Sequence, residues 1–280
     1  MIKIIADTLS CLSIEKAREL GVDFIPQIIE FGEQAFRDDT EIDSITFLKK
    51  LRSSSTLPKT AAPPPAMYEP LYRKYSQEGH TVLVICPSAQ VSGTVRSAEV
   101  AAKEFPNADI RVIDTKSIGA GLGTLVQAAV AWANQGLDAD IVEKRVLDMA
   151  AREKLYFVVD TLEYLQRGGR IGKAQALFGS LLQVKPILTF RDGHTEPVES
   201  QRTKRRAMAR IMELVLSDCP KGSDSHLGLM QGDAMEDALA LAEDFKQNLG
   251  ISNIPIFFLP PAILVHAGPG AIGISYFCKK

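Results

Sequence analysis

The first half of the chain alternates short apolar runs with segments of helical periodicity. The run at residues 81–86 carries no charge at all, which is typical of a strand buried on both faces of a sheet. Two further runs of strand length lie at residues 2–6 and 110–114. Helical patterns fall between and after these runs, at residues 14–20, 44–51, 94–105, 119–135 and 139–152. Strands that alternate with helices predict a parallel sheet covered on both faces.

A second series of elements begins near residue 154. Strands are predicted at residues 156–159, 186–190, 195–200, 226–230, 255–259 and 262–265, with helices at 203–216 and 235–249. Asp192-Gly193 lies between two of these strands and predicts a β-hairpin. A length of 280 residues also exceeds the size of about 100–200 residues that is usual for one domain. We therefore predict two α/β domains with mainly parallel or mixed sheets, residues 1–153 and 154–280.

Composition and charge exclude several classes of protein. Lys and Arg number 32 against 34 Asp and Glu, so the strongly basic surface of a nucleic-acid-binding protein is not expected. The most apolar stretch, residues 254–265, contains three prolines and falls short of the roughly 20 residues of a spanning helix. Asp7 directly follows the first apolar run, so no signal peptide is expected. The four cysteines form no CxxC pair, which predicts no metal or cofactor and fits a reducing cytoplasm.

Two short segments in the first half carry hydroxyl groups that suit an anion. Ser92-Gly93-Thr94 follows the buried strand and opens a helix, where the hydroxyls and the free N–H groups of a first helical turn bind a carboxylate or a phosphate. Gly93 lets a ligand approach the backbone closely. Thr60 lies in a small-residue loop before another helix. Taken alone, Ser92 is better explained as a helix cap and Thr60 as an ordinary loop residue.

Three segments in the second half carry imidazole or guanidinium groups. Arg167 and Arg170 flank a Gly-Gly turn and are able to hold an oxyanion, or to lie free in solvent. His266 comes at the end of an apolar strand and before a glycine-rich turn, a place where a histidine either lines a site or bonds to backbone. Arg202 and Lys204 belong to a basic cluster that opens a helix. Such a charge run is usually a solvated face, but positive charge in a first turn opposes the helix dipole and leaves a negatively charged partner as the alternative.

Together these segments resemble the DegV family, bacterial fatty-acid-binding proteins that serve as the binding subunit of fatty acid kinase. The resemblance covers essentially the whole chain, and the order and spacing of its marks are more specific than any one of them. The marks are Ala6-Asp7-Thr8, Thr60 with Pro63, Ser88 with Ser92-Gly93-Thr94, Asp114-Thr115, the run from Thr161 to Ile171, Lys185-Pro186-Ile187-Leu188 and His266-Ala267-Gly268-Pro269-Gly270. Ala61 and Ala267 depart from the family pattern, which usually has serine and threonine there.

The resemblance implies a lipid carrier that does no chemistry itself. A long-chain fatty acid would lie in a tunnel between the two domains, and Thr60, Ser92, Gly93, Thr94 and His266 would bind its carboxylate. A separate kinase subunit would phosphorylate this carboxylate to an acyl phosphate. We place the docking surface for that subunit at four basic residues, Arg167, Arg170, Arg202 and Lys204.

Two other functions compete with the carrier. The first is a hydrolase in which Ser92 is the nucleophile and His266 its base, although no Gly-x-Ser-x-Gly turn surrounds Ser92. The second is a binder of a nucleotide or sugar phosphate at Ser92-Gly93-Thr94, although no P-loop pattern is present.

Overall fold

The computed structural model of the chain describes residues 1–177 and 184–279. Its contacts divide into two compact units. The N-terminal unit comprises Met1–Asp43 and Thr56–Ala151, and the C-terminal unit comprises Ser44–Ser55 and Arg152–Lys280. The short segment 44–55, which the sequence assigned to the first domain, therefore packs with the second unit. The division into domains 1–153 and 154–280 stays a prediction.

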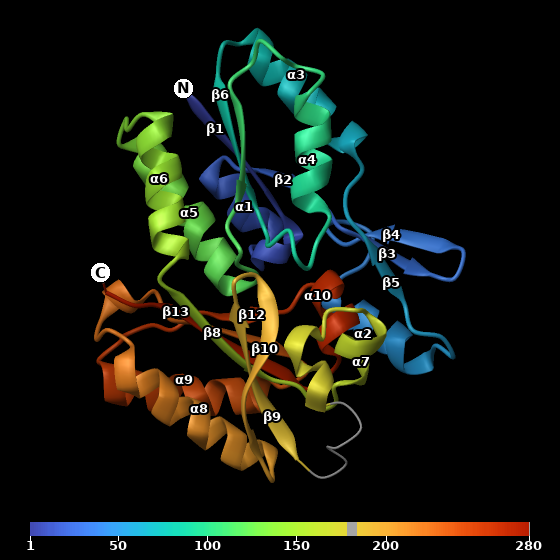
Figure 1. The fold of residues 1–280 in the computed structure, drawn as a ribbon, viewed down its shortest axis with the longest axis vertical. Coiled ribbons are helices and arrows are strands. Elements are labelled where there is room, and N and C mark those ends of the chain that lie inside the picture. Colours follow the sequence, from blue (N-terminus) through green and yellow to red (C-terminus); the bar gives the residue numbers. More distant parts are fainter. Residues whose placement is uncertain (178–183, 280) are drawn as a thin grey trace. The chain divides into compact units, whose positions relative to one another are not determined.

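A four-stranded parallel sheet forms the centre of the N-terminal unit (Figure 1). Its strands, in spatial order, are β2 (Asp23–Ile25), β1 (Ile2–Asp7), β6 (Thr81–Cys86) and β7 (Ile110–Asp114). Strand β6 lies inside the sheet, and its residues from Val82 to Cys86 are all buried. The uncharged run at residues 81–86 is thus the strand that the sequence predicts, because only apolar side chains tolerate burial on both faces.

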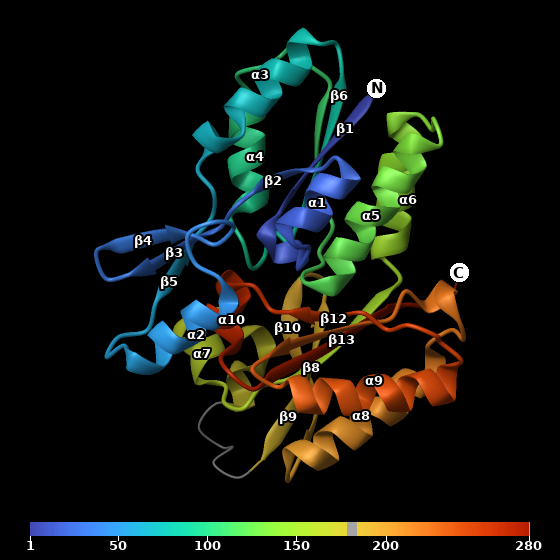
Figure 2. The same ribbon diagram turned by 180° about the vertical axis from the view of Figure 1, so that it is seen from behind.

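Helices cover both faces of this sheet. Helices α3 (Glu69–Gln77) and α4 (Thr94–Ala102) lie on one face, and α5 (Ala120–Asn134) and α6 (Ala139–Ala150) lie on the other (Figures 1 and 2). The short helix α1 (Ile14–Leu20) connects β1 to β2, and Ser13 caps it by accepting a hydrogen bond from the N–H of Lys16. Helices α3 and α4 share an apolar cluster with this sheet, which includes Tyr72, Ala98 and Val84.

A smaller antiparallel sheet also belongs to the N-terminal unit. It consists of β4 (Gln34–Arg37), β3 (Ile28–Phe31) and β5 (Lys59–Ala61), in that order. Thr60 lies on β5 opposite Ile29, so the expectation that it belongs to a loop is wrong. The sequence around Thr60 contains alanines and prolines that favour a turn, and its extended form arises because β3 supplies hydrogen-bond partners from about thirty residues earlier.

The C-terminal unit contains a six-stranded mixed sheet within its described residues. The spatial order is β10 (His194–Gln201), β9 (Lys185–Arg191), β8 (Glu153–Val158), β13 (Ala271–Phe277), β11 (Gly228–Gly232) and β12 (Ile256–Phe258). Strands β11 and β12 pair in parallel, and the other neighbours pair antiparallel. The predicted hairpin joins β9 to β10, and Asp192 and Gly193 both have the positive φ angles, 50° and 78°, that its tight turn requires.

Five helices surround this sheet in the described residues. The long helices α8 (Lys204–Asp218) and α9 (Met235–Leu249) pack against it through an apolar cluster that includes Ile211 and Phe245 (Figure 1). The shorter helices are α2 (Ser44–Ser53), α7 (Glu163–Arg167) and α10 (Pro261–Ala267), and α10 contacts both of the others. Over the two described ranges, no helix has both the length and the apolar character that a membrane span requires.

Helix α10 corrects one element that the sequence predicts. Residues 262–265 were expected to form a strand because they are apolar and partly β-branched. Pro261 instead occupies the first turn of a helix, where a missing N–H costs nothing and the fixed φ favours the helical conformation. Gly268, with a φ of 72°, ends the helix. His266 therefore lies in the last turn of a helix and not at the end of a strand.

Candidate functional site

The strand order of the N-terminal sheet indicates the edge at which a ligand would bind. The chain passes from β1 to β2 on one side and from β6 to β7 on the other, while β1 and β6 are neighbours. In an open parallel sheet, ligands bind outside the carboxyl ends of the two strands between which the order diverges. Asp7 ends β1, and Ser92-Gly93-Thr94 lies in the connection from β6 to α4. Both segments therefore lie at the edge where a ligand is expected.

Ser92, Gly93 and Thr94 form the turn that opens α4. Gly93 is the N-cap residue and provides no side-chain bond, so Ser92 is not the cap itself. The Ser92 Oγ accepts a hydrogen bond from the Thr94 N–H at 3.3 Å and lies 2.8 Å from the Thr94 Oγ1. Thr94 is buried, whereas Ser92 is half-buried. The Thr94 hydroxyl thus supports the turn from inside the protein, and the Ser92 hydroxyl lies nearer its surface.

Asp7 lies beneath this turn and was not among the predicted site residues. Its Oδ2 accepts hydrogen bonds from the Thr94 Oγ1 at 3.1 Å and the Gln27 Nε2 at 2.7 Å, and its Oδ1 accepts one from the Leu9 N–H at 3.1 Å. Burial raises the pKa of Asp7 from 3.8 to about 7; the Thr94 hydrogen bond opposes this rise, and the nearby Asp38 adds to it. An acidic residue directly after an apolar strand is the sequence signal from which Asp7 could have been found as a site residue.

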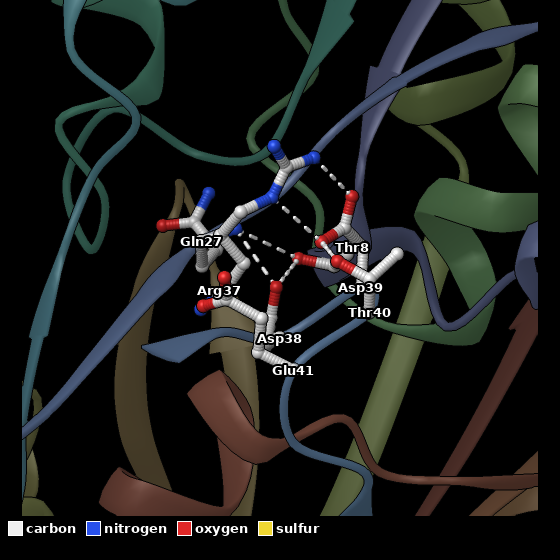
Figure 3. A network of polar contacts seen from close by, with 7 residues as sticks. All are labelled: Thr8, Gln27, Arg37, Asp38, Asp39, Thr40 and Glu41. Atoms are coloured by element: carbon white, nitrogen blue, oxygen red, sulfur yellow. Dashed lines mark hydrogen bonds and ion pairs between the residues drawn. The ribbon is translucent and has the colours of Figure 1, made fainter. Parts of the chain in front are cut away.

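Gln27 is fixed in place by a polar network on its other side (Figure 3). The Asp38 Oδ1 accepts hydrogen bonds from the Gln27 N–H and from the Thr8 Oγ1, both at 2.8 Å. Arg37 and Asp39 form a bidentate ion pair at 3.0 and 2.7 Å in the same segment. Because its backbone is fixed in this way, the Gln27 amide donates to both the Asp7 Oδ2 and, at 3.0 Å, the Thr94 Oγ1.

The structure also brings the Thr60 segment to the Ser92 turn. A Cβ atom at position 93 would lie 3.2 Å from the Cβ of Ala62, which is two residues beyond Thr60. Glycine at this position favours the close approach of the segment after β5 to the first turn of α4, because a Cβ would make an unusually tight contact there. Two of the predicted segments, separated by about thirty residues in sequence, are therefore neighbours in the N-terminal unit.

His266 belongs to the C-terminal unit, where it packs on the glycine turn that follows α7. A Cβ at position 168 would lie only 2.0 Å from the His266 Nδ1, so Gly168 is required for this contact. Burial, together with the positive charge of Arg170, lowers the pKa of His266 from 6.5 to about 3. The imidazole is therefore neutral at pH 7 and carries one N–H donor.

The four predicted docking residues lie in the C-terminal unit and differ in their surroundings. Arg167 is exposed and pairs with Glu163 one helical turn earlier, at 2.6 Å. Arg170 is half-buried, and its Nη1 donates to the carbonyl of Gly168 at 2.8 Å. Arg202 is exposed at the end of β10. Arg167 and Arg202 are therefore the two positions whose charge faces solvent most directly.

Lys204 has a role inside its own unit. Its Nζ donates to the carbonyl of Gly270 at 2.9 Å and lies 3.2 Å from Asp237 and 3.7 Å from Asp160. These contacts hold the glycine turn that follows α10. A basic residue in the first turn of α8 is thus explained by two carboxylates that lie far from it in sequence.

No group of three or more His, Cys, Asp and Glu side chains is placed to hold a metal ion among residues 1–177 and 184–279. The candidate site consists of hydroxyls, amides and one buried carboxyl group. The hydroxyls and N–H groups of the site are able to donate hydrogen bonds to an oxyanion such as a carboxylate, whereas an ionised Asp7 only accepts them.

The packing of His266 on Gly168 predicts the effect of a single methyl group. Gly168→Ala should destabilise the protein by about 1–3 kcal/mol, because the added Cβ displaces the imidazole. The measurement is the free energy of unfolding in urea. The double variant Gly168→Ala/His266→Ala should lose much less than the sum of the two single variants, because the ring that clashes is gone. Additive single effects would contradict this packing.

Comparison with known proteins shows the same family along the whole chain. The family model described as an uncharacterised protein of the DegV family matches residues 1–279. A DegV domain-containing protein of Streptomyces coelicolor is 34% identical over 275 residues, which are 98% of this chain and 97% of the relative. The protein DegV of Bacillus subtilis is 30% identical over 280 residues, which are 99% of each chain.

Solved structures agree with this assignment. A DegV family protein from Thermus thermophilus, described by its fatty acid binding, matches with a TM-score of 0.91 and 29% identity over 99% of each chain. The crystal structure of DegV from Bacillus subtilis, a fatty acid binding protein, matches with a TM-score of 0.89 and 28% identity over 99% of each chain. The two-domain α/β architecture that the sequence predicts is confirmed, and the chain belongs to the DegV family.

Proposed function

We propose that this protein binds a long-chain fatty acid and holds its carboxylate at the Ser92-Gly93-Thr94 turn. The observation that carries the proposal is the position of this turn at the edge of the parallel sheet where the strand order diverges. The two solved relatives described above are fatty-acid-binding proteins that match this chain from end to end. A carboxylate is the one charged group of such a ligand, and it needs a polar site of this kind.

The turn offers the carboxylate three kinds of interaction. The Ser92 hydroxyl and the free N–H groups of the first turn of α4 are hydrogen-bond donors. The positive end of the α4 dipole adds a favourable electrostatic interaction of up to about 1 kcal/mol. Thr60 belongs to the neighbouring strand β5 and is proposed as a further donor. Gly93 removes the side chain that would otherwise shield the backbone from the ligand.

The acyl chain supplies most of the affinity. Each buried methylene contributes about 0.8 kcal/mol, so a sixteen-carbon chain contributes roughly 12 kcal/mol before the entropic cost of association. A few hydrogen bonds to the carboxylate then fix the orientation of the ligand. This division of roles allows the loss of one head-group contact to weaken binding without abolishing it.

His266 is proposed as a carboxylate ligand that acts as a neutral donor. Its pKa of about 3 also makes it a poor general base at neutral pH, because it binds a proton too weakly. The Ser92 Oγ contacts the Thr94 hydroxyl, which supplies no base. The geometry therefore supports a binding protein better than a hydrolase built on Ser92 and His266.

We further propose that the bound carboxylate is presented to a separate kinase subunit. That subunit would transfer a phosphoryl group from a nucleoside triphosphate to a carboxylate oxygen, giving an acyl phosphate and a nucleoside diphosphate. The proposal rests on the family resemblance and on the exposed arginines of the C-terminal unit. Arg202 and Arg167 are the foremost docking positions, because Lys204 is held by carboxylates of its own unit.

The fatty-acid proposal predicts that purified protein carries lipid. Solvent extraction followed by mass spectrometry should give close to one fatty acid per protein molecule. Delipidated protein should melt at a higher temperature after fatty acid is added, because a ligand that binds only the native state stabilises it. Protein without extractable lipid, and a melting temperature that added fatty acid does not change, would contradict the proposal.

Ser92→Ala tests the head-group site. The variant should bind fatty acid more weakly by about 1–3 kcal/mol, roughly five- to 150-fold in Kd, because the charged carboxylate loses one hydrogen bond. Ser97→Ala, further along the same helix, is the matched control and should bind like the wild type. Equal affinity for the Ser92→Ala variant and the wild type would place the carboxylate elsewhere.

Charge reversal at Arg202 tests the docking proposal. Arg202→Glu should slow acyl-phosphate formation with the kinase subunit at low salt, and the difference from the wild type should shrink as salt rises, because mobile ions screen the charge. Fatty-acid affinity should stay the same. The control Lys144→Glu reverses an exposed charge on α6, and its rate should match the wild type. A wild-type rate for Arg202→Glu at low salt would remove Arg202 from the docking surface.

A further inference from the structure

A chain of three polar groups runs from the surface of the candidate site to its interior. The Ser92 Oγ lies 2.8 Å from the Thr94 Oγ1, and the Thr94 Oγ1 lies 3.1 Å from the Asp7 Oδ2. Each hydroxyl has a single hydrogen to donate. The direction of one hydrogen bond in this chain therefore fixes the direction of the next. At the Ser92–Thr94 contact, either oxygen is placed to be the donor.

An ionised Asp7 directs the hydrogens inward. A carboxylate only accepts, so the Thr94 hydroxyl donates its hydrogen to the Asp7 Oδ2. The Thr94 Oγ1 then accepts from the Gln27 Nε2 and from the Ser92 hydroxyl. The hydrogen of Ser92 is used in this contact. Ser92 presents only an oxygen lone pair to a ligand in this state, and a lone pair repels a carboxylate.

A protonated Asp7 directs the hydrogens outward. Its carboxyl O–H donates to the Thr94 Oγ1, which still accepts from Gln27. The hydrogen of Thr94 is then donated to the Ser92 Oγ, which also accepts from the Thr94 N–H. The Ser92 oxygen now has two donors, and its own hydrogen is available. In this state Ser92 donates a hydrogen bond to a carboxylate.

We propose that a fatty carboxylate binds at Ser92 together with one proton, which the Asp7 carboxyl group takes up from solvent. The proposal rests on the proposed function and names the residue that determines how tightly the carboxylate is bound at a given pH. No covalent bond of the ligand changes. One O–H bond forms on Asp7, two hydroxyls reverse their direction, and the negative charge of Asp7 is replaced by that of the ligand.

The surroundings of Asp7 favour such a transfer near neutral pH. The titratable side chains whose charges couple to it are Asp38, Cys11, Cys86 and Tyr68. Burial raises the pKa of Cys11, Cys86 and Tyr68, so all three are neutral at pH 7, and Asp38 raises the pKa of Asp7. With its pKa at about 7, Asp7 is in both protonation states over the physiological range.

The size of the effect follows from the fraction of molecules that bind. About nine tenths of the protein has a protonated Asp7 at pH 6 and about one tenth at pH 8, so affinity should fall by up to about tenfold over this interval. Fatty-acid binding should also take up protons, up to about nine tenths of one at pH 8 and at most about a tenth of one at pH 6.

Isothermal titration calorimetry measures both quantities. Tetradecanoate, kept below its aggregation concentration, is titrated into delipidated protein at pH 6, 7 and 8 in buffers of different ionisation enthalpy. Tetradecanol is the uncharged ligand of the same length. We expect its affinity to be independent of pH. The alcohol donates to the Ser92 oxygen when Asp7 is ionised, and it accepts from the Ser92 hydroxyl when Asp7 is protonated. An equal pH dependence for the alcohol and the acid would overturn the proposal.

Two pairs of variants separate the relay from general electrostatics. Asp7→Asn replaces the carboxyl group by an amide that does not titrate, so tetradecanoate binding should lose its pH dependence and its proton uptake. Asp114→Asn is the matched control at the end of β7, where the Oδ1 accepts from two backbone N–H groups and an asparagine keeps that acceptor. The Asp114→Asn variant should show the wild-type dependence of affinity and proton uptake on pH. Thr94→Ser should keep the pH dependence, and Thr94→Val should lose it.

The outcomes distinguish this inference from the proposed function. Tight tetradecanoate binding with a constant Kd between pH 6 and 8, or proton uptake that persists in Asp7→Asn, would overturn the relay and leave the fatty-acid proposal intact. Failure of the wild type to bind tetradecanoate at any pH would overturn both. The proton uptake of the wild type tests the relay even where a variant fails to fold, and wild-type binding without proton uptake at pH 8 would overturn it.

Discussion

The buried contact between Asp7 and Thr94 is the interaction on which the candidate site depends. It joins the end of β1 to the first residue of α4, two positions 87 residues apart. A carboxyl group inside a protein is costly unless donors surround it, and here Thr94, Gln27 and the Leu9 N–H supply them. Because these donors come from three separate segments, satisfying one acid also fixes the geometry of the turn that carries Ser92.

This contact makes stability and ligand binding depend on the same proton. The pKa of Asp7 is about 7 in the folded chain and 3.8 in an ordinary environment, so the folded state holds the proton more tightly. The resulting stabilisation is full below about pH 4 and is lost as pH rises through 7. An ionised Asp7 therefore lacks this stabilisation. In the proposed relay, a bound carboxylate restores the proton and the stabilisation with it.

In the C-terminal unit, glycines allow close packing around the candidate residue His266. Gly168 allows the His266 ring to approach the backbone, and Gly268 allows the following turn to approach the ring of Tyr164. Lys204 then closes the turn through the Gly270 carbonyl. Gly168 thus makes room for the neutral imidazole, and Gly268 and Lys204 fix the turn that follows α10. Gly168 and Gly268, which the sequence indicates only as turn residues, are required here for these contacts.

The sequence by itself determined the features that depend on neighbouring residues. The uncharged run of β6, the cap at Ser13 and the Asp192-Gly193 hairpin all follow from local patterns, and the order of short motifs indicated the family. Tertiary structure decided where partners come from far along the chain. It placed Thr60 on a strand, gave Lys204 its carboxylates and put Asp7 under Thr94. Hydrogen bonds and ion pairs join groups by distance in space, and that distance is set only when the sheets and helices have packed.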